Sequence, residues 1–383
     1  MSDAAFQVNM SQSNSSLCGY YEHYDLTRFV LIMAASGVAC LGVVLNAFLL
    51  WLFTVRQRQN LYLAVLATLD TLLCVSYVLL FGVDAMNVYL EVTLAFHLWH
   101  LYIIPLFIVS RTVQLIIPYV LVFATIERLI WLAENPNAKW WSLASEKGRI
   151  WASTGVLLGG VALKSPMIAC YRMKHFPNCT DLQRTMEVYP TAFFYSYAYY
   201  LYDFYFIALV QVFTPFAALF ALNAVIIRKL WKTQETATRA NPLAYADQHN
   251  QSKSALLLLS STGKALQRRI SIQVRLSARK MRNAIYTMCV ICITHLSCNC
   301  LHVILAILER LRSSVLEQNS NENRSSQLYI VLADVVSFLF MFCSVIRFFV
   351  YYKCNEEIRL AVRSIFRCDN TTRPGINGIA ADL

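Results

Sequence analysis

Charged residues are scarce in this 383-residue chain. Asp, Glu, Lys and Arg together make up 14% of it, whereas 57% is hydrophobic and the mean hydropathy is +0.48. A soluble domain of this composition would expose large apolar patches to water. The composition therefore favours a membrane protein and argues against a soluble globular one.

Other patterns are missing as well. The twelve cysteines lie mostly within apolar runs, with neither metal-site nor disulfide-framework spacing. His97 and His100 could meet a metal on one helical face, but no third ligand accompanies them, so we expect no metal and no cofactor. No basic segment followed by a short apolar one begins the chain, so we expect no cleaved signal peptide. We also expect neither enzyme activity nor a nucleic acid partner.

Seven apolar runs are long enough to cross a bilayer, which takes about 20 residues in a helix. They are 29–53, 61–83, 101–132, 150–170, 204–228, 284–308 and 328–352. They predict an all-α membrane protein whose bundle of seven transmembrane helices spans 29–352. An N-terminal segment, 1–28, precedes the bundle, and a tail, 353–383, begins with a short amphipathic helix. Within the bundle, the polar stretch 233–267 is typical of a flexible loop.

The distribution of Lys and Arg predicts the orientation. The loop before the sixth run is strongly basic ("GKALQRRISIQVRLSARKMRN"), and so is the tail. Because basic loops stay in the cytoplasm, we expect the N-terminus outside and the C-terminus inside, in the plasma membrane. Four glycosylation sequons then fall on the outer side. They begin at Asn9, Asn14, Asn178 and Asn323.

Polar residues inside the apolar runs are the best functional indicators, because they are costly at membrane depth. The ones that matter here are Asn46, Asp70, Glu127, Arg128, Pro215, Arg347 and Tyr351.

This ordered set resembles that of the rhodopsin-like (class A) G protein-coupled receptors, over residues 29 to about 367. Asn46, Asp70, Glu127-Arg128, Trp151, Pro215 and Tyr351 match the family's pattern in order. The phrases "ATIERL" and "PFAALFALNAVIIRKL" are similar to those of invertebrate FMRFamide-type neuropeptide receptors, above all the nematode branch. The chain also departs from the family: span six has "CNCL" without the usual proline, and no cysteine lies near Ile103 to tether span three.

The resemblance implies a receptor, embedded in membrane lipids, that binds an extracellular peptide and activates a heterotrimeric G protein. Glu127 would hold Arg128 at rest, and Tyr351 would move on activation. The alternative is that Arg128 only reaches the lipid headgroups. Arg347 stands where the family has an Asn that helps Asp70 bind sodium. We expect Arg347 to pair with Asp70 beside Asn46, rather than extend to the headgroups, and to make switching insensitive to sodium.

A ligand pocket is expected around "VSRTVQ" in the third run. Arg111 lies about one residue past the position where amine receptors carry an Asp, and no acid is nearby, which disfavours an amine. A cation here suits an acidic or carbonyl-rich ligand group. Alternatively, Arg111 pairs with an acid of the chain. The candidate pocket residues are Ser110, Arg111, Gln114, Asp203, Glu309 and Asp334.

Cysteines outside the spans suggest two modifications. Because thiols on the outer side oxidise, Cys179 is expected to form a disulfide, with Cys18 as the first candidate partner and Cys170 as the second. Cys368 follows the short interfacial helix, where it could be palmitoylated or remain a free thiol.

Two other functions stay open. A chemosensory receptor for small molecules would fit the divergent motifs. A channel or transporter would need polar residues along a continuous path, whereas Asn46, Asp70 and Arg347 form only one cluster.

Overall fold

The computed structural model describes residues 18, 25–55, 60–132, 144–229, 285–287, 289–297, 300, 301, 304, 307, 327–354 and 356–367. The chain divides into two compact units, one of residues 1–235 and 292–345, the other of residues 236–291 and 346–383.

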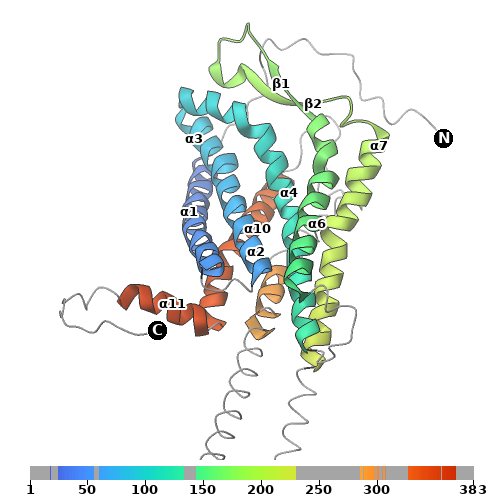
Figure 1. The fold of residues 1–383 in the computed structure, drawn as a ribbon. Coiled ribbons are helices and arrows are strands. Elements are labelled where there is room, and N and C mark those ends of the chain that lie inside the picture. The colour runs from blue at the N-terminus through green and yellow to red at the C-terminus, as the bar shows by residue number, and fades with distance from the viewer. Residues whose placement is uncertain are drawn as a thin grey trace, which may run out of the picture. The chain divides into compact units, whose positions relative to one another are not determined.

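The first unit is built from long helices. Helix α1 packs on α2, α2 on α4, and α4 on α6 (Figure 1). The α-helices that begin in this unit include α1 (Leu26–Val55), α2 (Leu61–Tyr77), α3 (Val83–Leu90), α4 (Thr93–Leu132), α6 (Glu146–Lys164), α7 (Tyr197–Tyr200) and α10 (Gln327–Cys354). Shorter π and 3₁₀ turns continue some of these helices: η1 (Val78–Gly82), η2 (Ser165–Ala169), η4 (Leu201–Ile207) and η5 (Leu209–Phe213). A separate 3₁₀ turn, η3 (Leu182–Arg184), follows η2 along the chain.

Within the described residues, six helical segments are long and apolar enough to cross a membrane. They are Leu26–Val55, Leu61–Leu90, Thr93–Trp131, Glu146–Ala169, Tyr197–Lys229 and Asp334–Cys354. Each overlaps one of the predicted spans, so the chain has the helices of an all-α membrane protein. The predicted span 284–308 is described only in part, with an apolar helix at Ile285–Ser297. The count of seven and the orientation of the termini therefore stay predictions.

Two glycines allow the helices to approach closely. A Cβ atom on Gly42 of α1 would lie 2.6 Å from Cγ2 of Val345 and 2.8 Å from Sγ of Cys74. A Cβ atom on Gly160 of α6 would lie 2.3 Å from Cγ1 of Ile116 on α4. Since helices in lipid associate mainly through close van der Waals packing, small residues are needed at both contacts.

Wide π turns interrupt two of the membrane helices, and side chains of α4 bond to their carbonyl oxygens. Trp99 Nε1 donates to the Leu80 oxygen at 3.3 Å and the Tyr102 hydroxyl donates to the Leu79 oxygen at 3.1 Å, both in η1. The Tyr119 hydroxyl donates to the Val210 oxygen in η5 at 2.7 Å. These bonds satisfy backbone acceptors at turns that depart from regular α-helical bonding.

A two-stranded hairpin follows η2, although no strand was predicted. Strands β1 (Tyr171–His175) and β2 (Met186–Pro190) are antiparallel, with Tyr171 opposite Pro190 and His175 opposite Met186. Cys179, between the strands, forms a disulfide with Cys18, with 4.9 Å between their Cα atoms. This is the pairing placed first from the sequence. It ties the N-terminal segment to the hairpin.

The second unit contains the end of α10 and helix α11 (Glu356–Arg367), the short helix predicted after the seventh span. Ile358 and Ala361 are buried, whereas Leu360 is exposed. A guanidinium nitrogen of Arg359 donates to the Lys353 carbonyl oxygen at 3.3 Å, across the join between α10 and α11. The predicted loop 233–267 lies outside the described residues.

Candidate functional site

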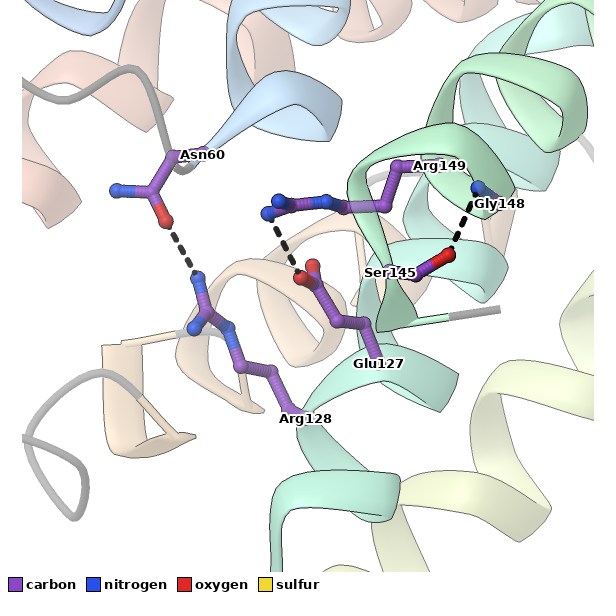
Figure 2. A network of polar contacts seen from close by, with 6 residues as sticks. All are labelled: Asn60, Glu127, Arg128, Ser145, Gly148 and Arg149. Atoms are coloured by element: carbon purple, nitrogen blue, oxygen red, sulfur yellow. Dashed lines mark hydrogen bonds and ion pairs between the residues drawn. The ribbon is translucent and has the colours of Figure 1, made fainter. Parts of the chain in front are cut away.

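A network of charged and polar side chains lies where α2 begins, α4 ends and α6 begins (Figure 2). Glu127 on α4 accepts a hydrogen bond from a guanidinium nitrogen of Arg149 on α6, with 3.3 Å between the two atoms. The side chains of Arg149 and Glu127 are only 12% and 5% exposed. A salt bridge with so little access to water is hardly screened, so it connects the two helices firmly.

Arg128, the next residue along α4, has different partners. One guanidinium nitrogen donates to Oδ1 of Asn60 at 3.0 Å, and the guanidinium carbon lies 4.7 Å from the ring centre of Trp131. Asn60 directly precedes α2 and makes no side-chain capping bond to that helix. Its amide is therefore directed toward α4, and Arg128 connects the two helices while its cation faces an aromatic ring.

The local sequence explains the position of Arg149. Ser145 has extended backbone angles and its hydroxyl accepts from the Gly148 N–H at 3.1 Å, which starts α6. Glu146 in the first turn is also favourable beside the positive end of the helix dipole. This cap fixes where the helix begins, and so it places Arg149 one turn into α6, facing Glu127.

Arg149 and Asn60 were both missed by the sequence analysis. The sequence predicted that Glu127 holds Arg128, but Figure 2 shows the two side chains directed toward different partners, Arg149 and Asn60. A restraint of Arg128 by Glu127 stays a prediction. The capping pattern "SEKGR" could have indicated that Arg149 lies in the first turns of a helix, but not which acid it faces.

A second polar cluster joins helices α1, α2 and α10. The Asn46 amide of α1 donates to the carbonyl oxygens of Gly42 at 3.0 Å and Ser344 at 3.2 Å. The Ser344 hydroxyl of α10 donates to Oδ1 of Asp70 on α2 at 2.8 Å. All three side chains are buried. The structure thus brings together two of the predicted residues, Asn46 and Asp70, through a serine that was not predicted.

Arg347 and Tyr351 lie further along α10, in the second unit, and both are buried. The predicted pairing of Arg347 with Asp70 stays a prediction, as does the role of Tyr351 in switching.

The predicted pocket residues are divided between separate places. Ser110 is buried in α4. Gln114 lines a small cavity of about 30 Å³ together with Gln211 and His295, and its buried Oε1 accepts no hydrogen bond from a described residue. A cavity of this size holds a few water molecules rather than a peptide side chain.

The charged candidates lie elsewhere. Asp334 forms a salt bridge with Arg28 at 3.1 Å, so it is not the described partner of Arg111. The guanidinium of Arg111 lies 5.1 Å from the ring centre of Phe107, and Asp203 lies in η4. Glu309 is outside the described residues.

Of the predicted modification sites, Asn178 is exposed between β1 and β2, as an acceptor for a glycan must be. Asn9, Asn14, Asn323 and Cys368 lie outside the described residues. Cys170, the second candidate for a disulfide, is a buried free thiol.

Comparison with known proteins does not assign the site. No model of a known protein family matches the chain, and no curated protein matches it significantly. The proposals below therefore rest on the residues and their contacts.

Proposed function

We propose that this chain is a seven-helix receptor of the rhodopsin-like G protein-coupled type, with its N-terminus outside the plasma membrane and its C-terminus inside. It binds an extracellular ligand, most simply a neuropeptide, and activates a heterotrimeric G protein. The sixth predicted span completes the bundle of seven.

The sidedness of the first unit supports this orientation. The disulfide joins residue 18 to the β1–β2 hairpin, so in the proposed topology both lie on the same side of the membrane. Helix alternation then puts the ends of α4 and α6 that carry Glu127 and Arg149 on the opposite side. Because disulfides persist in oxidising compartments, the hairpin side is the outer one, and the polar network faces the cytoplasm.

The network around Glu127 and Arg128 is the observation that carries the proposal. An adjacent acid and arginine at the inner end of a membrane helix, each held by a different neighbouring helix, form a latch that connects three helices. A partner protein that binds at this end could compete for Arg128 or separate α4 from α6. A G protein that binds more tightly when these contacts are broken would respond to a movement of the helices.

The experiment that tests the proposal is ligand-stimulated nucleotide exchange. The chain would be reconstituted in nanodiscs with purified heterotrimeric G proteins and exposed to a library of neuropeptides. We expect at least one peptide to accelerate exchange on one class of G protein. A ligand-evoked current through planar bilayers, with no exchange on any G protein, would favour a channel and overturn the proposal.

A further inference from the structure

A lysine that no motif accounts for lies buried at the outer end of α6. Lys164 is the last residue of the helix and is only 6% exposed, with its side chain on the inward face. Among the described residues, its ammonium makes no hydrogen bond and no ion pair. An ammonium this deeply buried is unstable unless it is paired or surrounded by hydrogen-bond acceptors.

Two other charges lie near this lysine. Arg111 of α4 and Asp203 of η4 are both within electrostatic range of Lys164. The Tyr202 hydroxyl donates to the Leu163 carbonyl oxygen, which holds η4 against the end of α6. Within the described part of the chain, no two of the three charged side chains form an ion pair, although Arg111 and Asp203 are both close enough to Lys164 to influence its charge.

Aromatic side chains lie beside these charges. The Phe107 ring lies 5.1 Å from the Arg111 guanidinium and makes an edge contact with the Tyr171 ring at 5.8 Å between ring centres. Tyr171 begins β1, which places the hairpin next to this part of α4. The site therefore combines cations with apolar ring surface, as ligand sites in membrane proteins often do.

We propose that Lys164 and Arg111 together bind a carboxylate of the ligand. The proposal rests on the proposed function and narrows it, because it states the chemical class of the ligand. Two cations against one described acid leave one positive charge, which a single carboxylate neutralises. A phosphate dianion would leave these three charges and the ligand with a net negative charge, so it is disfavoured. Phe107 and Tyr171 favour an apolar or aromatic group beside the carboxylate.

The test measures binding without a G protein. The full chain in nanodiscs would be melted with increasing 3-phenylpropionate, with its neutral amide, and with inorganic phosphate. We expect the acid to raise the thermal midpoint, and the amide and phosphate to leave it nearly unchanged. A capped peptide containing Phe-Glu, compared with its Phe-Gln analogue, distinguishes a peptide carboxylate from that of a small organic acid.

Variants locate the site. Lys164→Gln and Arg111→Gln should each weaken the binding of 3-phenylpropionate by about tenfold or more, as expected for a lost charge-assisted hydrogen bond. Lys164→Arg should keep most of the affinity. Lys174→Gln and Arg172→Gln remove the same charges from exposed positions on β1 and should bind as the wild type does.

Equal stabilisation by the acid and the amide, or unchanged affinity in Lys164→Gln, would overturn the proposal. If Lys164→Gln does not fold, the proposal is tested by two other measurements. These are the stabilisation of the wild type by the acid relative to the amide, and the affinity of Lys164→Arg for the acid. If acids raise the thermal midpoint of the protein but no peptide stimulates nucleotide exchange, the carboxylate site is supported and the receptor function is contradicted. The two failures are therefore distinguishable.

Discussion

The two ends of the α4–α6 helix pair are built differently. At the end that we propose to face the cytoplasm, the inner end, Glu127 and Arg149 form a buried salt bridge. At the opposite end, the proposed outer end, the two cations Arg111 and Lys164 lie near each other, and Asp203 is the described acid that influences Lys164. Arg111 and Arg128 are roughly 25 Å apart along α4, at 1.5 Å per residue, so the two ends do not share partners.

The difference indicates at which end the charged side chains already have partners within the protein. Charges that satisfy one another stabilise the resting structure, and breaking them costs free energy. Charges gathered without contact raise the free energy of the empty protein and lower that of a complex with the missing anion. On our proposal, the inner end is a structural latch and the outer end is a site that requires a ligand. Each prediction below tests this contrast.

The largest effect is expected at the inner end. Glu127→Gln removes the negative charge opposite Arg149 and leaves a buried guanidinium without its ion pair. The free energy of unfolding should fall by about 3 kcal/mol, which would lower the thermal midpoint measured in nanodiscs. If the chain is a receptor, basal nucleotide exchange should also rise.

The double variant Glu127→Gln/Arg149→Gln is the control for this effect. It removes both charges, so it should recover part of the lost stability, and the coupling between the two positions measures the salt bridge. Additive losses in the two single variants would mean that the latch contributes nothing.

A substitution in α6 between the two ends should affect both the stability of the protein and its binding of ligand. Gly160→Val would place a Cβ atom 2.3 Å from Cγ1 of Ile116 and force α4 and α6 apart. We expect a loss of about 1–3 kcal/mol, together with weaker binding of 3-phenylpropionate. Ile116→Ala in the same chain should restore much of both properties. Gly159→Val, where nothing lies within 4 Å of the added Cβ atom, is the matched control.

The outer end should respond with the opposite sign. Lys164→Met removes a buried cation that has no described ion pair and keeps a side chain of similar length. We expect stability to be unchanged or to rise by on the order of 1 kcal/mol, measured as the thermal midpoint without ligand. A loss as large as that of Glu127→Gln would show that Lys164 is a structural charge and that the two ends do not differ in kind.

The sequence predicted the membrane helices well, for a simple physical reason. Runs of about 20 apolar residues have few alternatives to a helix in lipid, because every backbone group must bond within its own segment. Some helices begin earlier than predicted, where polar or aromatic residues precede the apolar run. Helix Thr93–Leu132 begins before the predicted 101, and the fifth begins at Tyr197 rather than 204.

The contacts between helices were much harder to predict. Asn46 and Asp70 were recognised as one cluster, but the hydroxyl of Ser344 that joins them looks like an ordinary small residue in the sequence. The partner of Glu127 depends on how α6 is rotated against α4, which the sequence pattern does not reveal. The π turns depend on Trp99, Tyr102 and Tyr119 reaching across from another helix, and the hairpin depends on a disulfide to a distant cysteine.

The smallest effect concerns a thiol just below the hairpin. Burial raises the pKa of Cys170, and Asp203 raises it further, although a hydrogen bond from Tyr199 acts in the opposite direction. A raised pKa means less thiolate at a given pH, and the thiolate is the form that alkylating reagents attack. At neutral pH, Cys170 should therefore react with iodoacetamide more slowly than free cysteine does.

Raising the pH should sharpen this difference. The rate for Cys170 should keep increasing in the range where the rate for free cysteine has levelled off, because its thiolate forms at higher pH. Peptide mapping by mass spectrometry follows the reaction, and Cys18 and Cys179 should stay unlabelled because they are joined in a disulfide. In Asp203→Asn the acid no longer opposes the thiolate, so the rate for Cys170 should rise slightly at each pH. An unchanged rate would place Asp203 too far from this end of α6 to influence its charges, and would remove the acid from the outer cluster.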